Sequence, residues 1–107
     1  MTRHLTHRAG GAVADIAAIE PELIRYVQLC DGPLPQPVAI AETEAVCERL
    51  YPGDGDFPLF DFLRAAPRDQ TLGIECPSLR RARSGVSAAD QAKEAMAKLR
   101  RTMAEVN

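Results

Sequence analysis

Residues 23–30 read LIRYVQLC and stop at the turn segment 31–33, which reads DGP. Residues 71–76 read TLGIEC and stop at Pro77. Both runs combine β-branched and apolar side chains and end at turn residues, a pattern that predicts two strands. About 40 residues separate the runs, whereas a hairpin needs only a short loop. The spacing therefore predicts parallel strands joined by a crossover connection.

Four other segments carry helical patterns, and their order along the chain indicates the fold class. The order is helix, strand, two helices, strand and helix, which predicts an α/β architecture with parallel strands. The last helix opens on SAAD at 87–90, a sequence similar to a capping box. The four predicted helices span residues 12–19, 37–50, 56–66 and 87–106.

Each predicted helix has an apolar face, and the last one needs a sheet or another helix to cover it. In chain order, the residues expected on these faces are Val13, Ile16 and Ile19; Ala41, Ala45, Val46 and Leu50; Leu59, Phe60 and Leu63; and Ala92, Met96, Leu99, Met103 and Val106.

The composition describes a small domain with few large apolar side chains. The chain has 107 residues, of which 46% are hydrophobic and 26% are charged, so disorder along its whole length is not expected. Alanine accounts for 17 residues and aromatic side chains for only five. A domain of this length has a small stability margin, and this core is thin for one that folds alone.

The charge distribution gives no case for nucleic acid as a partner. The net charge is −2, whereas nucleic-acid binding requires a basic domain or face. The strongest basic cluster is Arg80, Arg81 and Arg83, which we interpret as a solvated loop before the last helix. Phosphate recognition by these arginines is the alternative.

The three cysteines and the absence of a long apolar run point to a cytoplasmic protein. Cys30, Cys47 and Cys76 form no C-x-x-C pair, which argues against a disulfide scaffold or a structural zinc site. We expect a reducing compartment, with Cys30 and Cys76 packed in the interior. No apolar run approaches the length of a membrane span, and Asp15 interrupts the alanine-rich N-terminal stretch, so neither a membrane nor a signal peptide is expected.

The strand pattern brings two polar side chains to the same place. Alternation puts Tyr26, Gln28 and Cys30 on one face of the first strand and Gly73 with Glu75 on one face of the second. Ligand sites of α/β folds form at the carboxyl ends of parallel strands, where Gln28 and Glu75 lie. The alternatives are that Glu75 reaches solvent or an arginine and that Gln28 makes a core hydrogen bond.

Two other features carry weaker signals for a site. His4 and His7 stand before the RAGG segment, where a surface position is the simpler interpretation. The GDG segment at 53–55 predicts a tight turn, because the chain has neither a G-x-G-x-x-G pattern nor a lysine-bearing phosphate loop.

Five short motifs together resemble a known family. In order they are RAGG at 8–11, ADIAAI at 14–19, YVQLCD at 26–31, PGDGDFPL at 52–59 and IECP at 74–77. The chain resembles the C-terminal part of the sugar phosphate isomerases/epimerases of the xylose isomerase-like TIM-barrel family. The resemblance implies that residues 1–107 form a single partial (β/α)8 barrel domain, from just after the fifth strand through the eighth. A full barrel takes about 250 residues.

The resemblance also implies a metal-dependent site. Glu75 would be the last-strand carboxylate that ligates a divalent metal and serves catalysis, and Gln28 would replace a histidine ligand of many relatives. His4 would match the family's motif histidine, with His7 as a rival because the spacing to Arg8 is one residue longer than usual. The metal would be manganese, magnesium, cobalt or zinc.

Two further residues would face the substrate by the same resemblance. Arg8 would contact a sugar hydroxyl or a phosphate, and Asp31 would lie either behind the ligating side chains or on the substrate side of the site. The implied reaction is a metal-assisted proton or hydride shift on a sugar or a similar hydroxycarbonyl compound.

Three interpretations remain open at this point. In the first, the chain is an enzyme fragment that is inactive alone and becomes active when a complementary N-terminal chain or a second copy completes the barrel. In the second, it is a non-catalytic remnant or an oligomerising interaction module without a complete metal site. In the third, it is an unrelated small α/β domain. A partial barrel also exposes sheet edges, which favours association.

Overall fold

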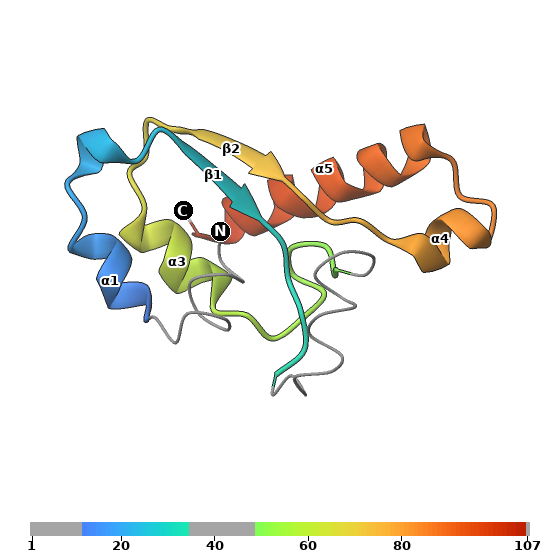
Figure 1. Cartoon of the computed structure of the whole chain (residues 1–107), viewed down its shortest axis with the longest axis horizontal. Coiled ribbons are helices and arrows are strands. Elements are labelled where there is room, and N and C mark those ends of the chain that lie inside the picture. Colours follow the sequence, from blue (N-terminus) through green and yellow to red (C-terminus); the bar gives the residue numbers. More distant parts are fainter. Residues whose placement is uncertain (1–11, 35–48, 107) are drawn as a thin grey trace.

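The structure, a computed structural model, describes residues 12–34 and 49–106 and shows a mixed α/β fold (Figure 1). Residues 12–34 contain a short helix, a 3₁₀ turn and a strand, and residues 49–106 contain three helices and a strand. In chain order the elements are α1 (Val13–Ala17), η2 (Pro21–Leu23), β1 (Tyr26–Leu29), α3 (Leu59–Ala65), β2 (Thr71–Ile74), α4 (Leu79–Arg83) and α5 (Ala88–Val106).

The two strands pair in parallel, which confirms the prediction made from their spacing. The register aligns Tyr26 with Thr71 and Leu29 with Ile74. The backbone N–H of Glu75 donates to the carbonyl oxygen of Leu29 at 3.1 Å, so the pairing continues just past β2. Helix α3 lies between the two strands in the chain, as a crossover connection requires.

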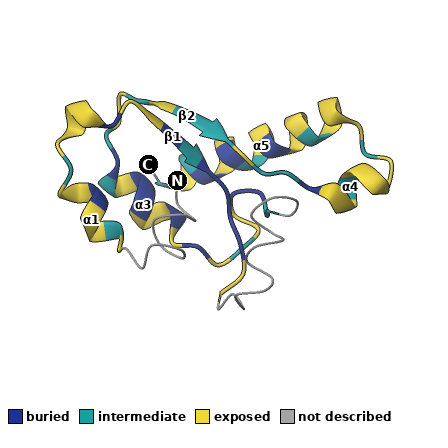
Figure 2. Ribbon diagram, viewed as in Figure 1, coloured by how far each residue is buried: buried dark blue, intermediate teal, exposed yellow. Residues whose placement is uncertain are grey.

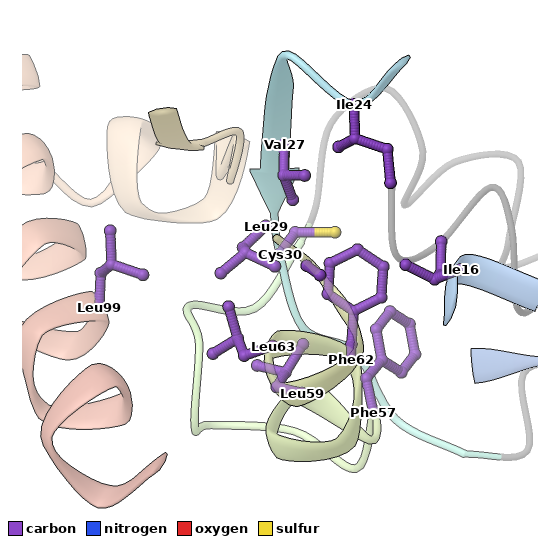
Figure 3. Close-up of a cluster of buried hydrophobic side chains, with 11 residues drawn as sticks. Ile16, Ile24, Val27, Leu29, Cys30, Phe57, Leu59, Phe62, Leu63 and Leu99 are labelled. Atoms are coloured by element: carbon purple, nitrogen blue, oxygen red, sulfur yellow. The ribbon is translucent and has the colours of Figure 1, made fainter. Parts of the chain in front are cut away.

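One face of β1 packs into the hydrophobic core. Val27 and Leu29 are buried, whereas Tyr26 on the opposite face is half-exposed. Figure 2 shows buried positions among exposed ones on helices α1, α3 and α5. Figure 3 shows the rings of Phe57 and Phe62 below this strand. The buried core residues are Ile16, Ile24, Val27, Leu29, Cys30, Phe57, Leu59, Phe62, Leu63, Ala66 and Leu99.

Helix α1 is shorter than the predicted 12–19 segment, but it presents the expected residue to the core. The Asp15 carboxylate accepts the backbone N–H of Ala12 at 2.7 Å and closes the first turn. Ile16 is almost fully buried.

Helix α3 buries a different set of residues from the one predicted for 56–66. Leu59 and Leu63 are buried as expected, but Phe60 is 38% exposed and Phe62 is buried instead. Helix geometry explains the difference, because Phe62 and Leu63 follow Leu59 by three and four positions and lie on its face, whereas Phe60 directly follows Leu59 and turns away from it. The stripe is therefore Leu59, Phe62 and Leu63.

Helix α5 begins as the SAAD sequence predicts. The Ser87 hydroxyl accepts the backbone N–H of Asp90 at 3.1 Å. The predicted stripe is correct only in its second half: Leu99 is buried, and Met103 and Val106 pack against the core. Ala92 is exposed, Met96 is 40% exposed, and the remaining buried positions are Ala95 and Thr102. Ala95 and Thr102 are small or polar, so the pattern of large apolar residues does not reveal that they lie on the buried face of α5.

Two other predictions of local structure need correction. Most of the predicted helix 37–50 lies outside the described residues, but Arg49 is not helical and Leu50 forms an antiparallel bridge with Asp31. The cluster of Arg80, Arg81 and Arg83 belongs to helix α4 rather than to a loop. The Ser78 hydroxyl begins this helix by accepting the backbone N–H of Arg81 at 3.3 Å. Across the described residues, no helix combines the length and the apolar character that crossing a membrane requires.

Candidate functional site

The candidate site lies where the chain leaves the carboxyl ends of β1 and β2. Asp31, which follows β1, exchanges two backbone hydrogen bonds with Leu50, at 2.9 and 3.1 Å. The N–H of Arg49 donates to the carbonyl oxygen of Pro77, beyond β2, at 2.9 Å. The 49–50 segment therefore joins the ends of both strands through main-chain hydrogen bonds.

Glu75 reaches an arginine, one of the two alternatives that its strand-end position left open. Arg49 Nη1 donates to Glu75 Oε2 at 2.7 Å and to the Glu75 carbonyl oxygen at 3.3 Å. The Arg49 side chain is only 8% exposed, whereas that of Glu75 is 49% exposed. Glu75 is thus an oriented carboxylate with a substantial surface open to solvent.

Gln28 lies at the same edge of the sheet, as the strand pattern predicts. It is half-buried and aligns in register with Gly73. A Cβ atom at position 73 would stand 2.1 Å from the hydroxyl oxygen of Tyr26, so the Tyr26 ring lies across the glycine. Gln28 and Glu75 therefore share the sheet face that points away from the hydrophobic core.

Asp31 organises the main chain beside the site. Its buried carboxylate accepts backbone N–H groups from Gly32 at 2.8 Å, Gly53 at 2.9 Å and Phe57 at 3.0 Å. A Cβ atom at position 55 would stand 2.5 Å from Asp31 Oδ1, so glycine is required there for the loop to close on the carboxylate. The resemblance placed Asp31 behind the ligating side chains or on the substrate side; here both of its oxygens serve the 49–57 loop.

A cleft of about 140 Å³ opens at this edge, and we call it the arginine cleft. Three of its lining side chains are arginines, and the segments that line it follow β1, precede α3 and follow β2. The lining residues are Asp31, Gly32, Pro33, Arg49, Leu50, Tyr51, Asp54, Ser78, Arg80 and Arg81.

Tyr51 and Arg81 link the cleft to helix α5. The guanidinium carbon of Arg81 lies 4.5 Å from the centre of the Tyr51 ring, within range of a cation–π interaction. Arg81 also forms an ion pair with Glu94 of α5. Burial raises the pKa of the Tyr51 hydroxyl, and the positive charge of Arg81 opposes that shift. These contacts hold the Arg81 side chain in a defined position.

The cysteines near the site are free thiols, and neither is poised as a nucleophile. Cys30 is buried in the core and Cys76 is partly buried, which confirms the expected interior packing. Cys76 Sγ donates to the carbonyl oxygen of Leu29 at 3.7 Å. Burial and then the neighbouring Cys30 raise the pKa of Cys76 to about 12, and a reactive cysteine requires the opposite shift.

The described residues do not assemble the metal site that the resemblance implies. Of its members, Gln28 and Glu75 lie at the expected edge, whereas His4, its rival His7 and Arg8 lie outside the described residues. Within residues 12–34 and 49–106, no three side chains of His, Cys, Asp or Glu gather to hold a metal ion. Glu75 is engaged with Arg49 instead.

Sequence reasoning missed the arginine that orients Glu75. Arg49 stands inside the predicted helix 37–50 and is not among the residues expected on its apolar face. Arg80 and Arg81 did carry a signal, because phosphate recognition was the alternative interpretation of their cluster. No family model, no curated protein and no solved structure matches the chain.

Proposed function

We propose that this chain is the C-terminal portion of a sugar phosphate isomerase/epimerase with a (β/α)8 barrel fold. The observation that supports the proposal is the β1–α3–β2 unit, whose parallel strands bring Gln28, Glu75 and the arginine cleft to one edge. Ligand sites of barrels form at that edge of the strands. Residues 1–107 then form one partial barrel domain.

The substrate is a sugar or a sugar phosphate that is held at the exposed end of Glu75. A carboxylate fixed by an arginine can accept a hydrogen bond from a sugar hydroxyl and can move a proton between neighbouring carbons. The half-buried side chain of Gln28 lies on the same sheet face, next to the proposed position of the sugar.

The described residues alone do not supply enough ligands to hold a divalent metal, so the proposed proton transfer does not depend on a metal bound by these residues. A complementary N-terminal chain or a second copy would have to bring further carboxylates or histidines to the edge. We therefore propose that the chain is inactive alone and acts in a reducing, cytoplasmic setting, in accord with Cys30 and Cys76, which form no disulfide within the described residues.

Sugar binding tests this proposal directly. We expect saturation-transfer NMR with pentose and hexose phosphates to show saturable binding to the full chain, and Glu75→Gln to weaken it at least tenfold. Glu22→Gln is the matched control, because Glu22 is an exposed carboxylate on η2. An absence of binding by every sugar phosphate, or equal losses in the two variants, contradicts the proposal.

A non-catalytic remnant is the second candidate, and the Glu75–Arg49 ion pair favours it because the carboxylate then serves the structure. Incorporation of solvent deuterium into a bound sugar phosphate, with Mn²⁺ added, distinguishes the two candidates. Exchange that Glu75→Gln abolishes supports an enzyme that a second copy completes. Binding without exchange at any protein concentration excludes completion by a second copy and leaves either the remnant or a fragment that needs its N-terminal chain. Tight stoichiometric Mn²⁺ binding that Glu75→Ala abolishes would show that the chain completes a metal site.

A further inference from the structure

Tyr26 is a half-exposed aromatic side chain on the sheet face that points away from the hydrophobic core. Gln28 and Glu75 share this face. The backbone of Tyr26 aligns with Thr71, but its hydroxyl group lies over Gly73, two residues farther along β2. The side chain therefore leans along the sheet toward the carboxyl ends of the strands, where Glu75 lies.

Gly73 allows this position of the Tyr26 hydroxyl group. A Cβ atom at position 73 would overlap the hydroxyl oxygen and would stand 2.9 Å from the ring carbon that bears it. Any larger residue at this position would therefore push the end of the Tyr26 side chain out of its place. Glycine weakens a strand and often marks a point where another group approaches closely. Here the approaching group is the tyrosine hydroxyl.

The Tyr26 hydroxyl group forms no hydrogen bond with the described residues. A tyrosine hydroxyl can donate one hydrogen bond and accept another. On the same face the charge of Glu75 is balanced by Arg49, and Gln28 and Thr71 are uncharged. An aromatic ring on a polar surface without excess charge suits a neutral, hydroxyl-bearing body better than an anion.

Tyr26 and Glu75 are close enough for one sugar to contact both. The Tyr26 hydroxyl lies over Gly73, and a strand rises about 3.3 Å per residue, so it stands about 6.6 Å along the strand from position 75. The hydroxyl groups of one pentose or hexose span such a distance.

We propose that Tyr26 binds the uncharged body of the sugar held at Glu75. Its hydroxyl group bonds one sugar hydroxyl, and its ring, whose face is partly negative, lies against carbon-bound hydrogens of the sugar. This assignment rests on the proposed function, because a sugar has to occupy the site.

Tyr26→Phe tests the assignment, because it removes the hydroxyl group and keeps the ring. We use the pentose or hexose phosphate that the full chain binds most tightly. We expect Tyr26→Phe to raise its dissociation constant about fivefold, the effect of losing one neutral hydrogen bond. Thr71→Val is the matched control, because it removes an exposed hydroxyl from the same sheet face at the end farther from Glu75 and should leave binding unchanged. Thermal unfolding verifies that both variants are folded.

Monodeoxy analogues of that sugar phosphate supply a measurement that a purely structural role of Tyr26 would not affect. The analogue that lacks the hydroxyl bonded by Tyr26 should bind the wild-type chain and Tyr26→Phe equally, whereas the other analogues keep the difference of about fivefold. A loss in Tyr26→Phe that is the same for every analogue overturns the assignment.

The possible outcomes separate this inference from the proposed function. If Glu75→Gln weakens sugar binding but Tyr26→Phe binds as the wild-type chain does, the role of Tyr26 is overturned and the proposed function stands. If no sugar phosphate binds the full chain, both are overturned.

Discussion

Asp31 shows how one buried carboxylate can set the path of a loop. Its three backbone donors come from positions 32, 53 and 57, so the carboxylate ties the end of β1 to a segment more than twenty residues later. Hydrogen bonds to a charged acceptor are stronger than neutral ones, and a buried N–H group that loses its acceptor is costly. The Asp31 side chain therefore stabilises the loop that carries Arg49, Tyr51 and Asp54.

Replacing Asp31 with asparagine is expected to destabilise the protein by about 2–3 kcal/mol. The amide oxygen is a weaker hydrogen-bond acceptor than a carboxylate oxygen, and the amide NH₂ group would face a buried backbone N–H group that has lost its acceptor. Urea unfolding measures the change in the free energy of unfolding. Asp61→Asn is the control, since its pair with Arg64 at 3.4 Å is exposed and should contribute less than about 0.5 kcal/mol. Equal effects of the two substitutions would contradict this role for Asp31.

The partly buried thiol of Cys76 makes the free energy of unfolding depend on pH in the alkaline range. The ordinary thiol pKa of 9.0 rises to about 12 in the folded chain because burial disfavours the thiolate. The contribution of this group is therefore fully present below about pH 9 and declines as the pH rises from about 9 toward 12, where the unfolded chain gains the charge first.

Comparison of the wild-type chain with Cys76→Ala isolates this effect, because both chains keep Tyr51, whose pKa is shifted in the same direction. The stability difference between the two chains, measured by urea unfolding, should be largest at about pH 8 and smaller at about pH 10. A difference that does not change with pH would show that the thiol is not desolvated.

At the scale of elements, the buried face of α5 includes Ala95 and Thr102 beside Leu99, whereas the large side chain of Met96 is partly exposed. Leu99, Ala95 and Thr102 contact the rest of the molecule, and the Thr102 hydroxyl donates back to the Lys98 carbonyl oxygen at 3.0 Å. Leu99→Ala should cost about 2–4 kcal/mol because it leaves a cavity between α5 and the core. Met96→Ala should change the free energy of unfolding by less than about 1 kcal/mol, because Met96 lies largely outside the contact. Similar losses in both variants would refute this orientation of the helix.

The elements also show what the sequence can and cannot predict. The parallel pair was predictable because two apolar runs stand too far apart for a hairpin. Helix α4 was missed because Leu79–Arg83 is too short to show a period and its start depends on the Ser78 hydroxyl. The edge positions of Gln28 and Glu75 followed from strand alternation.

The contacts that define the site depend on pairings that no local pattern reveals. Arg49 and Glu75 are 26 residues apart, as are Asp31 and Phe57. Only the folded chain brings these partners together, so their roles as a fixed ion pair and a loop anchor could not be predicted.

At the scale of the whole molecule, the described sheet has two strands, and β2 pairs within it on one side only. An apolar groove lies between β2 and α5 and is lined by Ile74, Cys76 and the half-exposed Met96, among others. Open strand edges beside apolar surface favour association.

We expect sedimentation velocity to show association that increases with protein concentration. Met96→Glu should weaken it, because the charge enters the groove, whereas Ala104→Glu on the exposed side of α5 should not. A monomer that persists at high concentration would count against an incomplete barrel.

The contact between Arg81 and Tyr51 has a practical consequence for spectroscopy. The chain has no tryptophan and only two tyrosines, so its intrinsic fluorescence comes from Tyr26 and Tyr51. Tyr26 lies on the open sheet face, and Tyr51 lies beneath a guanidinium that lines the cleft. Any ligand that displaces Arg81 changes the surroundings of one emitter and leaves the other in place. The tyrosine fluorescence of the unlabelled protein can therefore report the binding of a ligand in the arginine cleft.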